Sequence, residues 1–361
     1  MIIESIELKK FRNYRELELQ FDEKTNILYG DNAQGKTNIL EALYLSGTTK
    51  SHKGSKDRDM IYFGEDEAHL RTFVKKGEID YKIDIHLKKN KTKGIAINGL
   101  PIRRASELFG IANFVFFSPE DLSIIKQGPA ERRRFLDMEL CQLDKVYLHN
   151  LSNYNKIVAQ RNKLLKDLAF RSDLEETLDI WDLQLAEYGK KVIQGREQFV
   201  EQLNQIISGI HTNLSGGKEH LTIVYEKNCS KEEIYDLLRR NRERDLRMKT
   251  SSVGPHRDDL LFSVDGIDIR KFGSQGQQRT AALSLKLSEI ELVKKIISDT
   301  PILLLDDVLS ELDQNRQNYL LNSIHDIQTM ITCTGLDEFI NHRFSINKIF
   351  RVIEGTVSSE N

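Results

Sequence analysis

The chain has 361 residues, of which 39% are hydrophobic and 30% are charged, and its formal net charge at pH 7 is -2. This length suffices for about two domains that each bury a core. The balanced charge excludes attraction to nucleic acid through bulk charge, so any such binding has to use local basic patches. No apolar run reaches the roughly 18 residues that a membrane-spanning helix needs, so none is expected.

The beginning of the chain and its cysteines indicate a cellular compartment. Residues 1–9 carry charges where a secretory signal peptide has its apolar core, so no signal peptide is expected. Cys141, Cys229 and Cys333 are isolated in the sequence, which favours neither a disulfide framework nor a cysteine zinc site. We therefore expect a cytoplasmic protein without a membrane partner.

The N-terminal part of the chain is predicted to be rich in strands. Apolar and charged residues alternate over residues 6–8 and 17–21, which is typical of half-buried strands. Residues 26–29 form a short apolar strand that runs directly into a glycine-containing loop. The later strands expected in this part are residues 83–87 and 95–97, which form a hairpin, and the buried residues 114–117.

The loop after residues 26–29 matches the phosphate-binding pattern GxxxxGK[ST] in full. It consists of Gly30, Asp31, Asn32, Ala33, Gln34, Gly35, Lys36 and Thr37. Apolar residues at helical spacing follow, so the loop has the strand–loop–helix context of a phosphate site. In such a loop the backbone N–H groups face phosphates, Lys36 supplies positive charge between the β- and γ-phosphates, and the Thr37 hydroxyl ligates Mg²⁺. The alternative is a glycine turn before a helix that binds nothing.

From about Glu131 to Ile210 the pattern is helical and contains no proline. An apolar stripe from Leu151 to Leu168 leads to an expected turn at residues 170–173, and a heptad seam follows. A projecting antiparallel arm and a packed helical lobe both fit this pattern. The members of the seam are Leu174, Leu178, Trp181, Leu185, Tyr188 and Val192 and, after a stutter, Phe199, Leu203, Ile206 and Ile210.

Strands return after the helical stretch. Residues 221–225 are predicted to form a strand, and Ser230 with Glu233 forms a capping box that opens a helix to about Lys249. Residues 264–267 have the sequence of a hairpin turn. The last part of the chain alternates strand and helix, which is typical of α/β architecture. Its elements are a strand at residues 301–305, a helix after Asp313 and a strand at residues 329–332.

Two acidic residues follow the strand predicted at residues 301–305. Apolar residues bring Asp306 to the carboxyl end of a buried strand, where a carboxylate suits the outer shell of Mg²⁺. Asp307, one residue on, is placed to orient and deprotonate an attacking water. A solvated turn is the alternative for two adjacent acids, and the presence of the phosphate loop favours the catalytic interpretation, with Lys36 and Asp307 as the catalytic residues.

A third segment, residues 274–278, precedes a helix whose apolar positions begin at Ala281. It places the hydroxyl of Ser274 and the flexible Gly276, followed by Gln277, at a free helix N-terminus, which favours an anion by geometry and dipole. An ordinary serine cap beside a glycine is the alternative. The anion-binding interpretation is favoured only because the phosphate loop and the acids occur in the same chain.

In this order, the loop, the segment 274–278 and the acids resemble the signature set of ABC ATPases, with residues 310–313 as the D-loop. In that superfamily the signature of one subunit closes over the γ-phosphate held by the other. Further stretches look like the RecF family of bacterial recombination and repair mediators, which are SMC/ABC-type ATPases, and the resemblance covers the whole chain. These stretches are residues 9–14, 30–42, 129–137, 254–259 and 272–289.

The resemblance implies an α/β fold, namely an ABC/SMC-type P-loop ATPase head with an inserted α-helical arm. Residues 1–122 would be the N-terminal part of the head with the Walker A loop. Residues 123–245 would be the helical arm or second lobe, and residues 246–361 the part with the signature, Walker B and D-loop. Arg12 and Asn13 match the segment that lies against the nucleotide in such heads.

The resemblance also implies a function, that of an ATP-dependent DNA-binding protein of recombinational repair and replication restart. With ATP and Mg²⁺ it would form a homodimer that binds single-stranded, gapped and duplex DNA, acts beside RecO and RecR, and assists recombinase loading and SOS induction. The alternatives are an ATP-binding subunit of an ABC transporter and an interaction protein whose nucleotide site is structural.

Two departures from the ABC pattern predict weak, DNA-stimulated ATP hydrolysis that serves as a switch. ABC ATPases usually carry a glutamine after the strand at residues 114–117, where this chain has residues 118–120, Ser-Pro-Glu. They also carry a histidine after the last core strand, and residues 330–334 contain none. A missing imidazole near the γ-phosphate weakens hydrolysis.

Contacts with DNA are less visible in the sequence. The basic clusters are residues 132–134 and 239–249, and a solvated charged face explains such runs more often, so the resemblance alone favours DNA. His256 and Arg257 lie between a Gly-Pro turn and two acids. We interpret them first as a structural ion-pair cluster and second as contacts to nucleotide or DNA.

Overall fold

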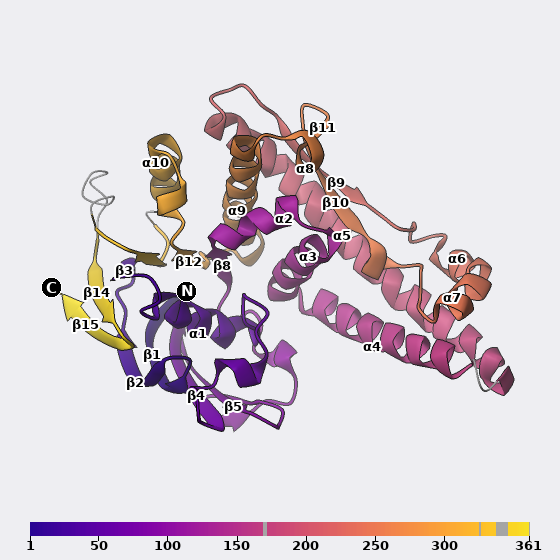
Figure 1. Ribbon diagram of the computed structural model, residues 1–361, viewed down its shortest axis with the longest axis horizontal. Coiled ribbons are helices and arrows are strands. Elements are labelled where there is room, and N and C mark those ends of the chain that lie inside the picture. The colour runs from indigo at the N-terminus through magenta and orange to yellow at the C-terminus, as the bar shows by residue number, and fades with distance from the viewer. Residues whose placement is uncertain (169–171, 325, 337–345, 361) are drawn as a thin grey trace. The chain divides into compact units, whose positions relative to one another are not determined.

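The computed structural model describes residues 1–168, 172–324, 326–336 and 346–360. The chain forms two compact units, which are coloured along the sequence in Figure 1. The first unit comprises Met1–Asp121 and Lys286–Asn361, and the second comprises Leu122–Leu285. The second unit is thus an insertion into the first. Among the described residues, no helix is both long and apolar enough to cross a membrane.

The second boundary differs from the one expected at residue 245. The strand β9 (Leu221–Glu226) pairs antiparallel with β10 (Asp259–Val264) along its whole length, and β10 pairs with β11 (Ile267–Asp268). This pairing ties residues 246–285 to the inserted unit. The predicted hairpin turn is confirmed, because Asp265 (φ 49°) and Gly266 (φ 84°) both adopt the left-handed conformation that a tight two-residue turn needs.

The phosphate loop of the first unit leaves a mainly parallel sheet with the strand order β15-β14-β3-β13-β12-β8. The strands β3, β13, β12 and β8 are parallel neighbours, so their carboxyl ends lie at one edge. Their apolar residues are buried on both faces, as expected for a parallel sheet. The bounds are β3 (Thr25–Tyr29), β8 (Phe114–Phe117), β12 (Ile302–Asp306), β13 (Thr329–Cys333), β14 (Lys348–Ile353) and β15 (Thr356–Glu360).

A second, antiparallel sheet of this unit has the order β2-β1-β4-β5-β6-β7. Its strands alternate buried and exposed residues, which confirms the strands and the hairpin predicted from the N-terminal pattern. Helix α1 (Lys36–Thr48) packs against strands of both sheets and is almost entirely buried. The bounds are β1 (Ile2–Phe11), β2 (Tyr14–Gln20), β4 (Glu67–Lys76), β5 (Ile79–Lys88), β6 (Gly94–Ile97) and β7 (Leu100–Pro101).

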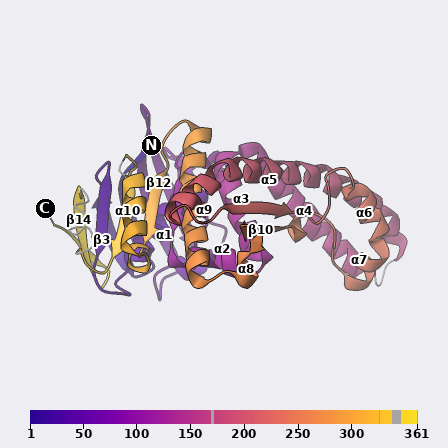
Figure 2. The ribbon, with the colours of Figure 1, turned by 90° about the horizontal axis from the view of Figure 1, so that it is seen from above.

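The second unit is mostly helical. Its longest helix, α5, runs beside α4 and also contacts β9 and α6 (Figure 2). Helix α9 begins in this unit and ends in the first, and α10 (Gln314–Ser323) follows there. The bounds are α2 (Leu122–Lys126), α3 (Pro129–Leu143), α4 (Lys145–Asp167), α5 (Leu178–Leu214), α6 (Ile234–Arg240), α7 (Arg242–Met248), α8 (Ile269–Phe272) and α9 (Gln275–Ile297).

The packing of α5 favours the helical lobe over a bare two-helix arm. Several members of the predicted seam are buried, but so are Asp182, Arg196 and His211, which a heptad pattern does not predict. They are buried because α4 covers one side of the helix while β9 and α6 cover another. Of the predicted turn, residues 170 and 171 lie outside the described part of the chain, and a 3₁₀ helix, Ser172–Thr177, begins directly after them. The side chain of Leu174 also lies outside the described part.

The single helix predicted from Ser230 to Lys249 is instead two short helices, α6 and α7. They meet at Asn241, whose side-chain amide donates a hydrogen bond to the carbonyl of Leu237 (2.8 Å). A side chain that binds the backbone in this way competes with helical hydrogen bonds and favours a break. Only half of the predicted capping box is seen: the Glu233 N–H donates to the Ser230 hydroxyl at 3.2 Å, and α6 itself begins after Glu233.

Candidate nucleotide-binding site

The phosphate loop connects β3 to α1 and contains two positions that only glycine fits. Gly30 has φ 149°, and a Cβ atom there would lie 2.3 Å from the carbonyl oxygen of Val352. Gly35 has φ 116°, and its Cβ atom would lie 2.4 Å from Nδ2 of Asn13. Both conformations are in the left-handed region that side chains disfavour. The tip of the loop, residues 31–33, is exposed.

Lys36 is folded into the loop. Its ammonium group donates hydrogen bonds to the carbonyls of Gly30 (2.5 Å) and Asp31 (2.7 Å), and the side chain is buried. Burial lowers the pKa of Lys36, against the opposing charges of Asp307 and Asp306. An ammonium held inside an exposed loop of N–H groups suits an incoming phosphate, which supplies the negative charge that the buried cation lacks.

Thr37 and Asp306 meet, although 269 positions separate them in the sequence. The Thr37 hydroxyl donates to Oδ1 of Asp306 at 2.7 Å, and the hydroxyl of Thr332 donates to the same oxygen at 2.8 Å. A hydroxyl and a carboxylate in contact form a set of hard oxygen donors, which is the kind that Mg²⁺ prefers. The residues present therefore fit Mg²⁺, and Thr332 is a member of the cluster that the sequence interpretation missed.

Asp307 has a strained backbone, with φ 52°. A left-handed conformation costs a non-glycine residue roughly 1–2 kcal/mol. Here it is held because the Asp307 N–H donates to the hydroxyl (3.0 Å) and the carbonyl (3.2 Å) of Thr332, and the Asp307 carbonyl accepts from the Ser310 hydroxyl (2.8 Å). The D-loop and β13 thus position this acid.

Asn13 and Arg12 support the loop from the adjacent strand connection. The Asn13 amide donates to the carbonyl of Gln34 (3.0 Å) and accepts from Asn38 (2.8 Å). The Arg12 guanidinium donates to both carboxylate oxygens of Glu41, at 2.6 Å and 2.8 Å. Burial opposes ionisation of Glu41, but the bonds from Arg12 and Ser51 outweigh it and lower the pKa of Glu41. Arg12 is therefore engaged with α1 in this structure.

Gln34 is held from the C-terminal side of the unit as well. Its side-chain oxygen accepts a hydrogen bond from the Glu354 N–H (2.6 Å), and its carbonyl accepts one from the Gly355 N–H (3.2 Å). Glu354 and Gly355 form the turn between β14 and β15, and no pattern in the sequence points to them.

The signature segment belongs to the second unit and caps α9. The Gln277 N–H donates to the Ser274 hydroxyl (3.2 Å), and the Ser274 N–H donates to the Gln277 side chain (2.9 Å), which is a capping box. Ser274 and Gly276 are exposed. The segment is thus an ordinary serine cap in its hydrogen bonds and is also open to a ligand or a partner.

A polar chain ties this segment to the end of α5. The Gln277 amide donates to one carboxylate oxygen of Glu219 (2.9 Å), and the other oxygen lies 3.2 Å from Nε2 of His211. The other nitrogen of His211 lies 2.9 Å from the hydroxyl of Ser284 on α9. Glu219 and His211 were not predicted, because their relation to residue 277 depends on the fold of the whole second unit.

Part of the basic clusters is structural. Arg132 is 1% exposed, and its guanidinium binds both carboxylate oxygens of Asp259, at 2.5 Å and 3.0 Å. Arg242 binds Asp182 at 2.7 Å. The other basic residues of the second cluster, Arg239, Arg240, Arg244, Arg247 and Lys249, are exposed.

His256 is a neutral structural residue rather than a member of an ion pair. Its Nδ1 lies 2.6 Å from the Tyr154 hydroxyl and its Nε2 lies 3.0 Å from the carbonyl of Ser251. Burial lowers the pKa of His256 to about 4. Arg257 donates to the same carbonyl at 2.9 Å. The structural interpretation of both residues is favoured, with hydrogen bonds in place of the expected ion pairs.

Three features define an ABC/SMC-type ATPase head: a phosphate loop between a parallel strand and a helix, two acids at the carboxyl end of β12, and a signature segment at the start of a helix. The model of the RecF/RecN/SMC N-terminal domain family matches residues 2–356. The chain is 67% identical over 357 residues to the DNA replication and repair protein RecF of Agathobacter rectalis, covering 99% of each sequence. It is 62% identical over 363 residues to the protein of that name from Lachnospira eligens, covering 100% of each. The chain belongs to the RecF family.

Solved structures agree with this assignment. A structure described as the recombination mediator protein RecF-ATP in the RecFOR pathway is 36% identical, with a TM-score of 0.93, and the match covers 99% of this chain and 97% of that one. A crystal structure of an Smc head bound to a domain of ScpA is 16% identical, with a TM-score of 0.59 over 100% of this chain and 97% of that one. The second likeness shows the fold alone. The resemblance and the fold class inferred from the motifs are therefore confirmed.

Proposed function

We propose that the chain is an ATP-dependent DNA-binding switch of recombinational DNA repair and replication restart. The observation that carries the proposal is the contact of Thr37 with Asp306 beside the buried ammonium of Lys36. It occurs in a member of a family whose curated proteins are named for DNA replication and repair. A relative of 36% identity is described as RecF-ATP.

The loop would hold the phosphates of ATP. Backbone N–H groups of residues 30–37 and the Lys36 ammonium are the donors, and Asn13 keeps the loop in shape through Gln34. Thr37 and Asp306 would hold Mg²⁺, which neutralises phosphate charge when it is bound. Arg12 would act mainly through Glu41, as a support for the start of α1.

Asp307 would orient a water molecule and accept its proton on the carboxylate. Its backbone is fixed by Thr332 and Ser310, so the carboxylate is attached to a rigid frame. Residues 330–334 provide no imidazole, and hydrolysis should therefore be weak and depend on DNA. A turnover on the order of ten per second without DNA would contradict this, since that is the rate of an ordinary enzyme.

Two copies of the chain would complete the site. Ser274, Gly276 and Gln277 would meet the γ-phosphate held by the loop of a second copy, in an isologous pair. The exposure of Ser274 and Gly276 supports this arrangement, because an exposed cap is free to meet a partner. ATP would then act as the link between the copies, and hydrolysis would release them.

The proposed homodimer would bind gapped, single-stranded and duplex DNA in the cytoplasm and act beside RecO and RecR in recombinase loading and SOS induction. Support for these partners comes from the RecFOR pathway named for the related structures. DNA contacts would use the exposed residues of the second basic cluster rather than Arg132, which is buried. The transporter alternative is not favoured, since the matched family model extends over residues 2–356.

Sedimentation of the wild type and Asp307→Asn, with ATP and Mg²⁺ and with or without gapped DNA, tests the proposal. The variant should accumulate as a dimer, because it retains the phosphate loop and lacks the group that accepts the proton. The wild type should dimerise transiently and return to monomer as ATP is consumed. Asp66→Asn changes an exposed acid (88% side-chain exposure) and serves as the control. A variant that binds ATP and stays monomeric would contradict the shared site.

A further inference from the structure

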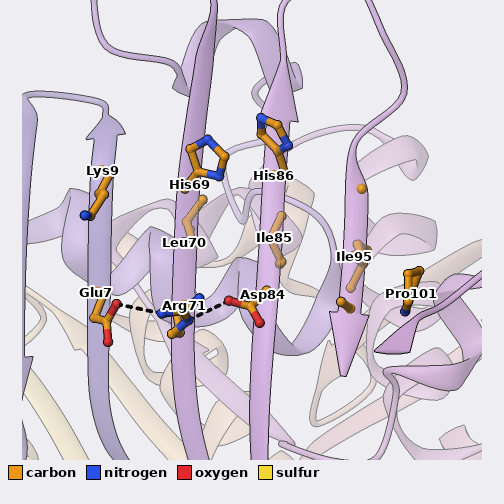
Figure 3. A pocket seen from close by; sticks show the side chains of 12 residues that line it. Glu7, Lys9, His69, Leu70, Arg71, Asp84, Ile85, His86, Ile95 and Pro101 are labelled. Carbon is orange, nitrogen blue, oxygen red and sulfur yellow. Dashed lines mark hydrogen bonds and ion pairs between the residues drawn. The ribbon is translucent and has the colours of Figure 1, made fainter. Parts of the chain in front are cut away.

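Two histidines and a glutamate gather on the outer face of the antiparallel sheet, away from the phosphate loop. His69 on β4 is paired directly with His86 on β5, so their side chains leave the sheet on the same face. Glu67 precedes His69 by two residues and therefore shares that face. Figure 3 shows the two imidazole rings next to each other at the end of a row of polar side chains.

The three side chains converge on a small volume. Nε2 of His86 lies 3.0 Å from one carboxylate oxygen of Glu67, and Nε2 of His69 lies 3.7 Å from the other. The two rings are stacked, with centroids 3.9 Å apart and planes inclined by 24°. One ligand atom from each residue lies within 4.8 Å of those of the other two.

This spacing is close to that of a zinc site. Zinc bonds of about 2.0–2.2 Å in tetrahedral geometry separate neighbouring ligand atoms by roughly 3.3 Å. The Glu67 carboxylate lies at similar distances from the two histidines, 3.0 Å from one oxygen to His86 and 3.7 Å from the other to His69. Small side-chain rotations on a rigid pair of strands would place the three atoms at three corners of a tetrahedron.

A hydrogen-bonded cluster without metal explains the arrangement less well. One imidazole is enough to give the Glu67 carboxylate a hydrogen bond. The second ring is stacked on the first, and protonation of both rings would be unfavourable because the two positive charges would repel each other. Imidazole and carboxylate together are the ligands of many zinc centres.

Two basic side chains on this face, Arg71 and Lys9, are already paired with other acids. Arg71 binds Asp84 (2.6 Å) and Glu7 (3.4 Å) in the neighbouring cross-strand row, as the dashed lines of Figure 3 show. Lys9 pairs with Glu16 at 3.1 Å. Glu67 is thus left to the two histidines rather than to an arginine.

A hollow of about 520 Å³ adjoins the cluster and is lined by both histidines together with Arg71, Ile85, Ile95 and Pro101. Three protein ligands leave one tetrahedral position for water or another molecule, which distinguishes such a site from a closed structural one. We propose that Glu67, His69 and His86 bind one Zn²⁺ ion, whose fourth position is open to water or to a small anionic ligand in this hollow. Arg71 would face such a ligand.

Zinc titration of the full-length protein, with a chelating dye as competitor and excess Mg²⁺ to fill the nucleotide site, tests the proposal. The wild type should bind one equivalent, and His69→Ala and His86→Ala should each lower the affinity on the order of 100-fold. Glu67→Gln should lower it on the order of tenfold. His149→Ala, which removes an exposed histidine in the second unit, should leave the affinity unchanged.

Cobalt substitution provides a readout that does not depend on activity. Co²⁺ bound to the wild type should give the intense visible absorption of a four-coordinate ion, and His69→Gln, which keeps the size of the side chain, should abolish it. Equal melting temperatures of the variants and the wild type would show that the sheet is intact. Absence of saturable zinc binding by the wild type would overturn the proposal. Zinc affinities of His69→Ala and His86→Ala equal to that of the wild type would overturn it as well.

Discussion

The phosphate loop, residues 30–37, and the signature segment, residues 274–278, differ in how the fold holds them. The loop is surrounded by its own unit. Lys36 is buried, the Gly30 N–H donates to the carbonyl of Cys333 on β13, and Gln34 is held by the β14–β15 turn and by Asn13. The signature segment caps a helix with Ser274 and Gly276 in solvent. It is held through Gln277, which donates to Glu219, and through the buried Gln278, which donates to the carbonyl of Ile269. A loop that is built completely in one unit can bind a ligand without a partner. An exposed helix cap contributes to binding only when a ligand or a second copy of the chain contacts it.

Replacement of Lys36 should give the largest effect, because it removes the charge from the half that binds alone. Lys36→Ala should weaken ATP binding on the order of 100-fold, or about 3 kcal/mol, which is typical of a lost charge-assisted contact to phosphate. Isothermal titration with ATP and Mg²⁺ measures it, and the exposed Lys50→Ala serves as the control. Unchanged affinity would mean that the loop is not the nucleotide site.

Acid should weaken the second unit through His256. Its pKa in the folded protein is about 4, below the ordinary value of about 6.5, so the folded ring stays neutral while the unfolded ring takes up a proton. The contribution of the neutral ring is complete above pH 6.5 and is lost as the pH falls toward 4. Between pH 6.5 and 5 the loss should be on the order of 2 kcal/mol.

Unfolding by denaturant at pH 7.5 and 5.0 measures the effect of His256. The fluorescence of Trp181, the one tryptophan of the sequence, reports on the second unit. His256→Asn removes the titrating group, so the difference between the two pH values should shrink. An undiminished difference in the variant would assign the acid sensitivity to other groups.

Removal of Glu219 should affect the signature segment and leave the phosphate loop unchanged, so it distinguishes the contributions of the two regions. Glu219→Ala takes away the acceptor of the Gln277 amide and the partner of His211, which costs about 1–2 kcal/mol in a charged hydrogen-bond network. ATP binding by the monomer should be unchanged, while ATP-dependent dimerisation should weaken on the order of tenfold. Glu232→Ala removes another exposed acid of the second unit as the control. Equal dimerisation of the variant and the wild type would show that the tether has no such role.

Thr332→Val should give the smallest effect. It tests a residue that positions the acids beside the phosphate loop. Valine keeps the shape but removes the hydroxyl that binds Asp306 and accepts from the Asp307 N–H. The substitution removes supports of Asp306 and Asp307 but neither carboxylate, so ATP turnover should fall a few-fold with little change in ATP affinity. Steady-state hydrolysis with gapped DNA measures it. A fall as large as that of Asp307→Asn would give Thr332 a direct part in the reaction.

The same contrast explains what the sequence could predict. The residues of the phosphate loop are contiguous, so their pattern was sufficient to locate them and the strand and helix on either side. Thr332 joins Asp306 only because β13 lies between β3 and β12, and strand order is not written in a local pattern. Glu41 and Glu219 were missed for the same reason, since each acts on a residue that is distant in the sequence.

The predictions from charge clusters and from helical periodicity were incomplete where neighbouring elements cover a further face of a helix. Arg132 looked like part of a basic surface, but β10 brings Asp259 against it and buries the pair. The seam of α5 predicted one apolar stripe, whereas the helix is covered from two sides and buries Asp182 and Arg196 as well. A single sequence shows which residues repeat on a helix, and the number of neighbours that the helix has is a property of the tertiary fold.

The position of β3 in its sheet has a consequence for folding during synthesis. Both neighbours of β3 are distant in sequence: β13 spans Thr329–Cys333 and β14 spans Lys348–Ile353. The second unit is continuous over Leu122–Leu285 and is complete much earlier during synthesis. A nascent chain on the ribosome would thus fold its insertion first. The strand before the phosphate loop would lack its first neighbour until translation has passed residue 333 and its second until translation has passed residue 353. Nucleotide binding would then be acquired only after both neighbouring strands have been translated.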